Sequence, residues 1–143
     1  MKGILINKLH QYIGENNPGL LLQLEQDGKV SEYLSNKVNT SDALINEYKD
    51  QPAYIIEDAC MDELTKDLRP SKYNYINQIL QEEFEDTYQQ LQQSGTLKFE
   101  VINLISQCQP VFEAIGFTEE NEDSSELRNA ITGTVSEYLE SNK

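Results

Sequence analysis

The chain has 143 residues, of which 25 are acidic and 11 are basic, so its formal net charge at pH 7 is −14. Binding to nucleic acid phosphates or to an anionic membrane surface depends on lysine and arginine, and this charge therefore argues against direct contact with either. Hydrophobic residues make up 38% of the chain, without a run near the roughly 20 apolar residues of a membrane span. These features predict one folded cytoplasmic domain, residues 1–143.

The negative charge is concentrated in the second half of the chain. Residues 1–72 hold 12 acids and 8 bases, whereas residues 73–143 hold 13 acids and 3 bases. The simplest interpretation is a solubilising surface. The alternatives are a docking face for a basic protein partner, or a mimic of the nucleic acid backbone that occupies a basic DNA-binding protein.

In the first half of the chain, apolar residues recur at helical spacing. A first helix is expected to end at Gly14, and a second, short helix opens at Pro18 and ends at Gly28. A third helix spans residues 30–48, with a weak point at residues 39–42 where it can divide. A further helical segment starts at Pro52 and reaches the proline at position 70.

The second half continues the same pattern. Ser71 is the expected N-cap of a long helix that ends at Ser94 and Gly95, with Phe84 pointing inward. The most apolar helix follows, and Pro110 inside it predicts a kink or a break over residues 106–109.

An acidic loop over residues 118–125 then leads to the last helix, which is capped by Ser124 or Ser125. Gly133 lies inside this helix and predicts close approach of another helix. The whole chain is expected to form an all-α, irregular bundle of six or seven helices.

Residue types that bind metals or react as nucleophiles are few. Cys60 and Cys108 fall in apolar helical patterns and are expected to be buried, reduced thiols, which indicates a reducing compartment. His10 is the only histidine, and we expect it on the surface. Neither a metal site nor a cofactor site is predicted, because close-spaced ligand pairs and phosphate-binding glycine loops are missing from the sequence.

Two groups of acids are candidate functional sites. Glu82, Glu85 and Asp86 share one side of a continuous helix, at spacings of three and four residues. They resemble the paired acids of general acid–base catalysis, with His10 or Tyr73 as a partner, although a solvated helix face is the simpler interpretation.

The acidic loop is interpreted as a mobile, solvated connection, with a weak divalent-ion or partner site as the alternative. Its four acids are Glu119, Glu120, Glu122 and Asp123.

Residues 64–139 resemble an uncharacterised bacterial family, the domain of unknown function 1896. The stretches that carry the resemblance are residues 64–68, 71–74, 79–80, 83–86, 108–112, 126–127 and 131–135. The resemblance implies an all-helical fold and a bacterial intracellular protein, of a kind found among genes of mobile elements in Bacteroides-type bacteria. It transfers no catalytic residue.

Within this resemblance, the best candidate for a functional surface is Ser71, Lys72, Tyr73 and Asn74. A purely structural role would explain the same residues equally well, because Ser71 caps a helix, Lys72 is exposed, and Tyr73 or Asn74 braces the turn.

The leading functional hypothesis is a non-catalytic interaction or accessory protein that docks on a basic partner through its acids. The enzyme and the nucleic acid mimic remain as alternatives. A homodimer formed through the apolar residues 20–24 is a third hypothesis.

Overall fold

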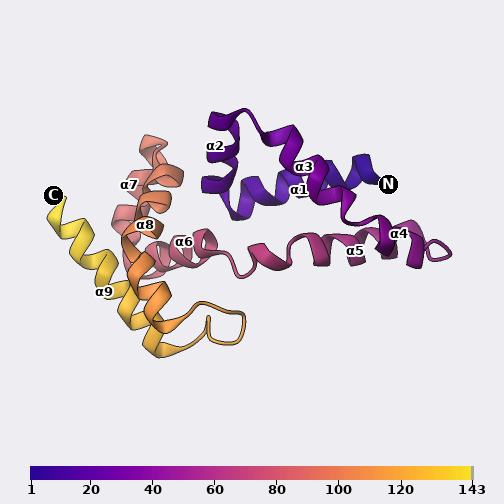
Figure 1. Cartoon of the computed structure of the whole chain (residues 1–143). Helices are drawn as coiled ribbons and strands as arrows, with labels where there is room; N and C mark the ends of the chain where they lie inside the picture. The colour runs from indigo at the N-terminus through magenta and orange to yellow at the C-terminus, as the bar shows by residue number, and fades with distance from the viewer. Residues whose placement is uncertain (143) are drawn as a thin grey trace. The chain divides into compact units, whose positions relative to one another are not determined.

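The computed structural model describes residues 1–142, and its regular structure within that range is entirely helical (Figure 1). The all-α prediction is therefore confirmed, but the expected count of six or seven helices is too low. Residues 1–142 contain nine α-helices and one short 3-10 helix, which are α1 (Lys2–Asn16), α2 (Pro18–Asp27), α3 (Val30–Asn39), α4 (Asp42–Glu47), α5 (Ala53–Leu64), η1 (Lys66–Leu68), α6 (Lys72–Glu83), α7 (Glu85–Ser94), α8 (Leu97–Ile115) and α9 (Ser125–Ser141).

These helices form two compact units, one of residues 1–69 and one that begins at Pro70. Each unit buries its own set of hydrophobic side chains. That the two units belong to one domain stays a prediction.

The core of the N-terminal unit forms where α1 packs against α3 and α5. Its buried side chains are Leu5, Leu9, Ile13, Leu34, Val38, Ile56, Cys60 and Leu64. The three residues from α1 follow the helical spacing that the sequence predicts. Every apolar residue of the 20–24 segment is half-buried, and Leu20 and Leu21 pack against this core. Part of the apolar surface that a homodimer would use is therefore covered within the unit, and the homodimer stays a prediction.

One helix boundary in this unit differs from the sequence prediction and another agrees with it. The expected end of α1 at Gly14 is wrong, because α1 continues to Asn16. The side chain of Asn17 then accepts a hydrogen bond from the backbone N–H of Leu20, which starts α2. The expected weak point at residues 39–42 is confirmed, since α3 ends there and α4 begins. At that break Ser41 is buried and forms a side-chain hydrogen bond with Cys60.

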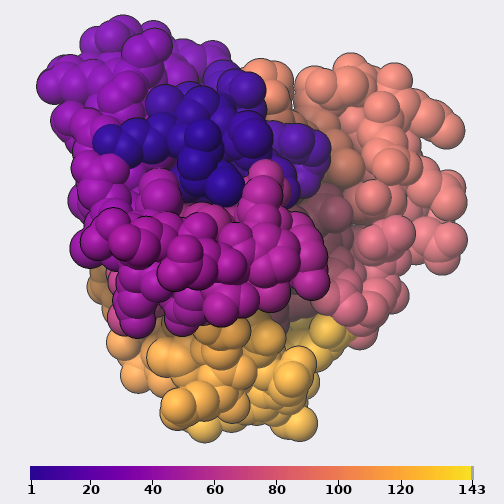
Figure 2. Space-filling view, turned by 90° about the vertical axis from the view of Figure 1, so that its right-hand side faces the viewer, coloured from indigo at the N-terminus to yellow at the C-terminus, as the bar shows by residue number. Residues whose placement is uncertain are grey.

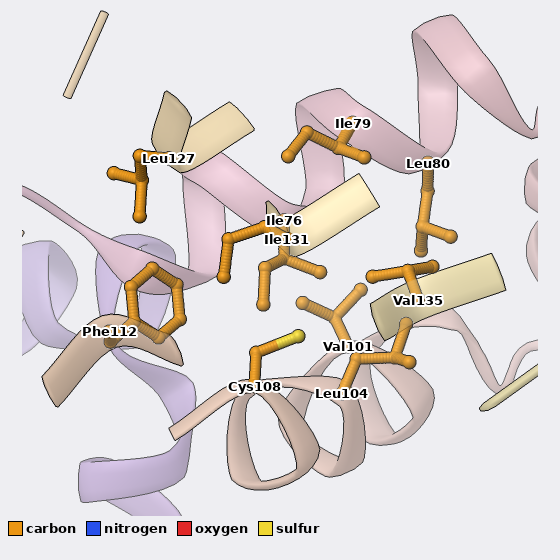
Figure 3. Close-up of a cluster of buried hydrophobic side chains, with 10 residues drawn as sticks. All are labelled: Ile76, Ile79, Leu80, Val101, Leu104, Cys108, Phe112, Leu127, Ile131 and Val135. Atoms are coloured by element: carbon orange, nitrogen blue, oxygen red, sulfur yellow. The ribbon is translucent and has the colours of Figure 1, made fainter. Parts of the chain in front are cut away.

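The core of the C-terminal unit forms between α6, α8 and α9 (Figure 3). Its buried side chains point toward one another from these three helices, and they are Ile76, Ile79, Leu80, Val101, Leu104, Cys108, Phe112, Leu127, Ile131 and Val135. Capping follows the sequence, because Ser71 accepts from the N–H of Asn74 and Ser124 accepts from the N–H of Leu127.

Two expectations for this unit are wrong, and a third is wrong in part. The helix after Ser71 is not continuous, since Phe84 has φ −136° and ψ 52° and separates α6 from α7. The physical reason is that the Phe84 side chain packs against the core. Of the kink or break expected before Pro110, the break is absent, because α8 runs through this exposed proline, and the kink stays a prediction. Gly133 is exposed, and a methyl group there would meet none of residues 1–142 within 4 Å, so no helix in that range approaches it closely.

Candidate functional site

The segment Ser71 to Asn74 begins α6 and is largely used for structure. The Ser71 hydroxyl accepts a hydrogen bond from the N–H of Asn74 at 3.0 Å. Lys72 was expected to be exposed, but its Nζ donates to Oε1 of Gln109 at 3.1 Å and lies 5.1 Å from the centre of the Phe112 ring. A lysine held by an amide oxygen and an aromatic face is restrained against α8 rather than free in solvent.

Tyr73 is also partly buried and packs against the core of this unit. Burial raises the pKa of its phenol, with a smaller contribution from Tyr88 of α7. A raised phenol pKa opposes use of Tyr73 as a base near neutral pH. Of the four predicted residues, Asn74 alone has an exposed side chain.

Glu82 is occupied by an ion pair that sequence spacing did not predict. Its Oε2 accepts from Arg128 of α9 at 2.7 Å, and the same guanidinium nitrogen donates to Glu83 at 3.2 Å. Gln78 donates to the other Glu82 oxygen at 2.9 Å. The hydrogen bonds from Gln78 and Arg128 lower the pKa of the Glu82 carboxyl. A catalytic acid near neutral pH needs the opposite shift, so Glu82 is unsuited to that role.

Glu85 and Asp86 do not share a helix with Glu82. They lie in the first turn of α7, beyond the break at Phe84, and both are exposed. Negative charge in the first turn of a helix is favoured by the helix dipole. Because α7 begins without a side-chain cap, these two carboxylates have a local role in stabilising it.

The acidic loop is organised by a residue that the sequence analysis missed. Asn121 Oδ1 accepts from the N–H of Thr118 at 2.7 Å, and its Nδ2 donates to the carbonyl of Gly116 at 2.7 Å. The Thr118 hydroxyl lies 3.1 Å from the same Oδ1. The combination of Thr118 and an asparagine three residues later was the available sequence signal.

This bonding fixes the turn on which the four loop acids stand. Glu119, Glu120 and Asp123 are exposed, and Glu122 is half-buried. The loop is therefore solvated, as expected, but its backbone is held by side-chain hydrogen bonds.

An aromatic cluster lies between this loop and α6. Tyr75 packs edge-on against Phe112 and Phe117, at centroid distances of 6.1 and 5.1 Å. The Tyr75 hydroxyl is buried and has no hydrogen-bond partner among residues 1–142. Burial raises its pKa, Arg128 acts in the opposite sense, and Asp123 and Glu122 raise it further. Two of the loop acids, Glu122 and Asp123, and the Arg128 guanidinium thus lie within electrostatic reach of the same phenol.

The remaining reactive groups show no catalytic arrangement. Cys60 and Cys108 are buried free thiols, and burial raises the pKa of Cys108 to about 11. His10 is exposed on α1. Over residues 1–142 no cluster of three or more histidine, cysteine or acidic side chains is arranged to hold a metal ion. No helix in the same range is both long enough and apolar enough to cross a bilayer.

Comparison with known proteins gives one family. Curated proteins and solved structures yield no significant match. The family match spans residues 7–143, so it includes most of the N-terminal unit and extends well beyond the resemblance found at residues 64–139. Since this match covers nearly the whole chain, the protein belongs to the family described as a domain of unknown function (DUF1896).

Proposed function

We propose that the protein is a non-catalytic interaction factor whose C-terminal unit docks on a lysine- and arginine-rich surface of a partner protein. The association with mobile elements that the family resemblance implies belongs to the same proposal. The observation that carries it is a surplus of exposed carboxylates for which this unit has too few cations.

From Pro70 onward the chain has 13 acids and 4 bases. Two of these bases are already engaged, because Lys72 is held by Gln109 and Phe112, and Arg128 binds two glutamates of α6. A third, Lys98, lies 5.4 Å from the centre of the Phe99 ring. With 13 acids and 4 bases, this unit has too few cations to pair with most of its carboxylates.

The N-terminal unit differs in this respect. Residues 1–69 contain 12 acids and 7 bases. Four of these bases form ion pairs, which are Lys2–Asp42, Lys8–Glu57, Lys37–Asp67 and Arg69–Asp62. The charge imbalance is thus greater in the C-terminal unit, which supports that unit as the docking side.

The exposed candidates that remain after the internal pairs are counted are Glu85, Asp86, Glu120 and Asp123. Exposed carboxylates speed encounter with a cationic surface and contribute to specificity more than to affinity. The interaction should weaken as salt rises, because the screening length falls to roughly 8 Å at physiological ionic strength.

The test is capture of partner proteins from a nuclease-treated lysate, with elution by a salt gradient. The docking variant combines Glu85→Gln, Asp86→Asn, Glu120→Gln and Asp123→Asn. The control variant neutralises four exposed acids of the N-terminal unit, Glu25→Gln, Glu47→Gln, Asp50→Asn and Glu63→Gln. Both variants change the net charge equally, so a general charge effect would alter both.

We expect a partner that elutes at intermediate salt from the wild type and from the control variant, and that is lost from the docking variant. Equal capture by all three proteins would contradict the proposal. The enzyme alternative is not favoured by any observation, since the pKa of Glu82 is lowered and His10 lies exposed on α1 of the N-terminal unit.

A further inference from the structure

Helix α7 is the least buried helix of the C-terminal unit. None of its 10 residues, Glu85–Ser94, is buried, whereas α6, α8 and α9 each bury at least three. Tyr88 is the residue of α7 that packs against the core, and Leu91 is half-buried. Few buried apolar contacts are the structural mark of a segment that opens at low free energy.

Both ends of α7 are marked by residues outside helical geometry. Phe84 precedes it with φ −136° and ψ 52°, and Gly95 follows it in the left-handed region at φ 74°. The first N–H groups of α7 have no side-chain cap. The backbone therefore leaves helical geometry at both junctions that connect α7 to α6 and α8.

The segments on either side of α7 are anchored more firmly. Arg128 binds Glu82 and Glu83 at the last turn of α6, and the Phe84 side chain packs against the core. After Gly95, α8 buries four side chains over its length. The chain is thus weakly held between Phe84 and Gly95 and firmly anchored on both sides of that segment.

We propose that α7 is a hinged arm, which opens and unfolds locally between Phe84 and Gly95 while α6, α8 and α9 remain folded. Local unfolding accompanies opening because isolated helices shorter than roughly 12–15 residues are marginal in water. Opening removes the Tyr88 side chain from its packing against the core, so it uncovers part of that core. In Figure 2 the salmon-coloured segment around α7 lies at the surface on the face in view.

The test is hydrogen exchange of the full chain, read by mass spectrometry on peptides from each helix. We expect the amides of α7 to exchange at least about 100-fold faster than those in the buried part of α8. Low concentrations of urea should accelerate exchange in α8 and leave α7 nearly unchanged, because local opening exposes little surface. Equal rates in α7 and α8, with equal urea dependence, would overturn the proposal.

A pair of variants tests the role of Tyr88. Tyr88→Ala should accelerate exchange in α7 by about tenfold and leave α6, α8 and α9 unchanged, because it removes the ring that packs on the core. Gln90→Ala changes an exposed residue of the same helix and should produce no acceleration. A uniform acceleration of all four helices by Tyr88→Ala would show that α7 belongs to the cooperative core. The wild-type urea series decides the question without any variant.

Discussion

Replacement of Asn121 by alanine tests whether the acidic loop is an ordered element. This change removes the side chain that joins Thr118 to Gly116 and leaves the four loop acids in place. Alanine can replace neither the acceptor for the Thr118 N–H nor the donor to the Gly116 carbonyl. The perturbation is therefore confined to the hydrogen bonds that shape the turn.

The expected loss follows from these two bonds, each 2.7 Å long. A protein hydrogen bond contributes about 0.5–1.5 kcal/mol net. Thr118 is exposed and Gly116 is half-buried, so water can replace part of the lost bonding. We expect the free energy of unfolding to fall by about 1–2 kcal/mol, which lowers the melting temperature by roughly 2–8 °C.

Urea unfolding followed by far-ultraviolet circular dichroism measures this loss, and a thermal melt provides an independent value. The control is Asn103→Ala, which makes the same chemical change at an exposed position of α8. It should cause no loss, because alanine is the better helix former. A loss at Asn121 below about 0.5 kcal/mol, or an equal loss in the control, would refute the reasoning.

Three other predictions concern charge, thiols and cooperativity. Folding lowers the pKa of Glu82 from its ordinary 4.5. The ionised Glu82 carboxylate therefore stabilises the folded protein fully above pH 4.5, and this stabilisation disappears as the pH falls through the pKa of Glu82 in the folded state. The stability difference between wild type and Glu82→Gln should therefore close on acidification, and a pH-independent difference in denaturation midpoint would contradict the role of Arg128. Cys60 and Cys108 should resist a soluble thiol reagent in the native protein and react fully in denaturant, because both are buried; rapid native labelling of either would be inconsistent with this core. Spectroscopic probes in each unit should report one urea midpoint if residues 1–143 form a single domain, whereas separate midpoints would count against it.

The positions of most helices follow from the sequence alone. Ser71 and Ser124 mark helix starts, and Gly28 and Gly95 mark helix ends, as the structure confirms. These signals are reliable because each one acts on backbone groups within a few residues. The amphipathic spacing of apolar residues likewise predicted much of both cores. The turn at Asn121 also depends on residues that are close in sequence, so it could have been predicted as well.

Tertiary structure decided the features that bear on function. Phe84 interrupts a pattern that is helical on both sides, because its side chain packs against the core. Lys72 is held against α8 by Gln109, which lies 37 positions away, and Glu82 is paired with Arg128, which lies 46 positions away. Sequence spacing fixes which residues share a helix face, but not which residue of another helix meets that face. The charges available to a partner are those left over after such long-range pairings, and only the folded chain defines them.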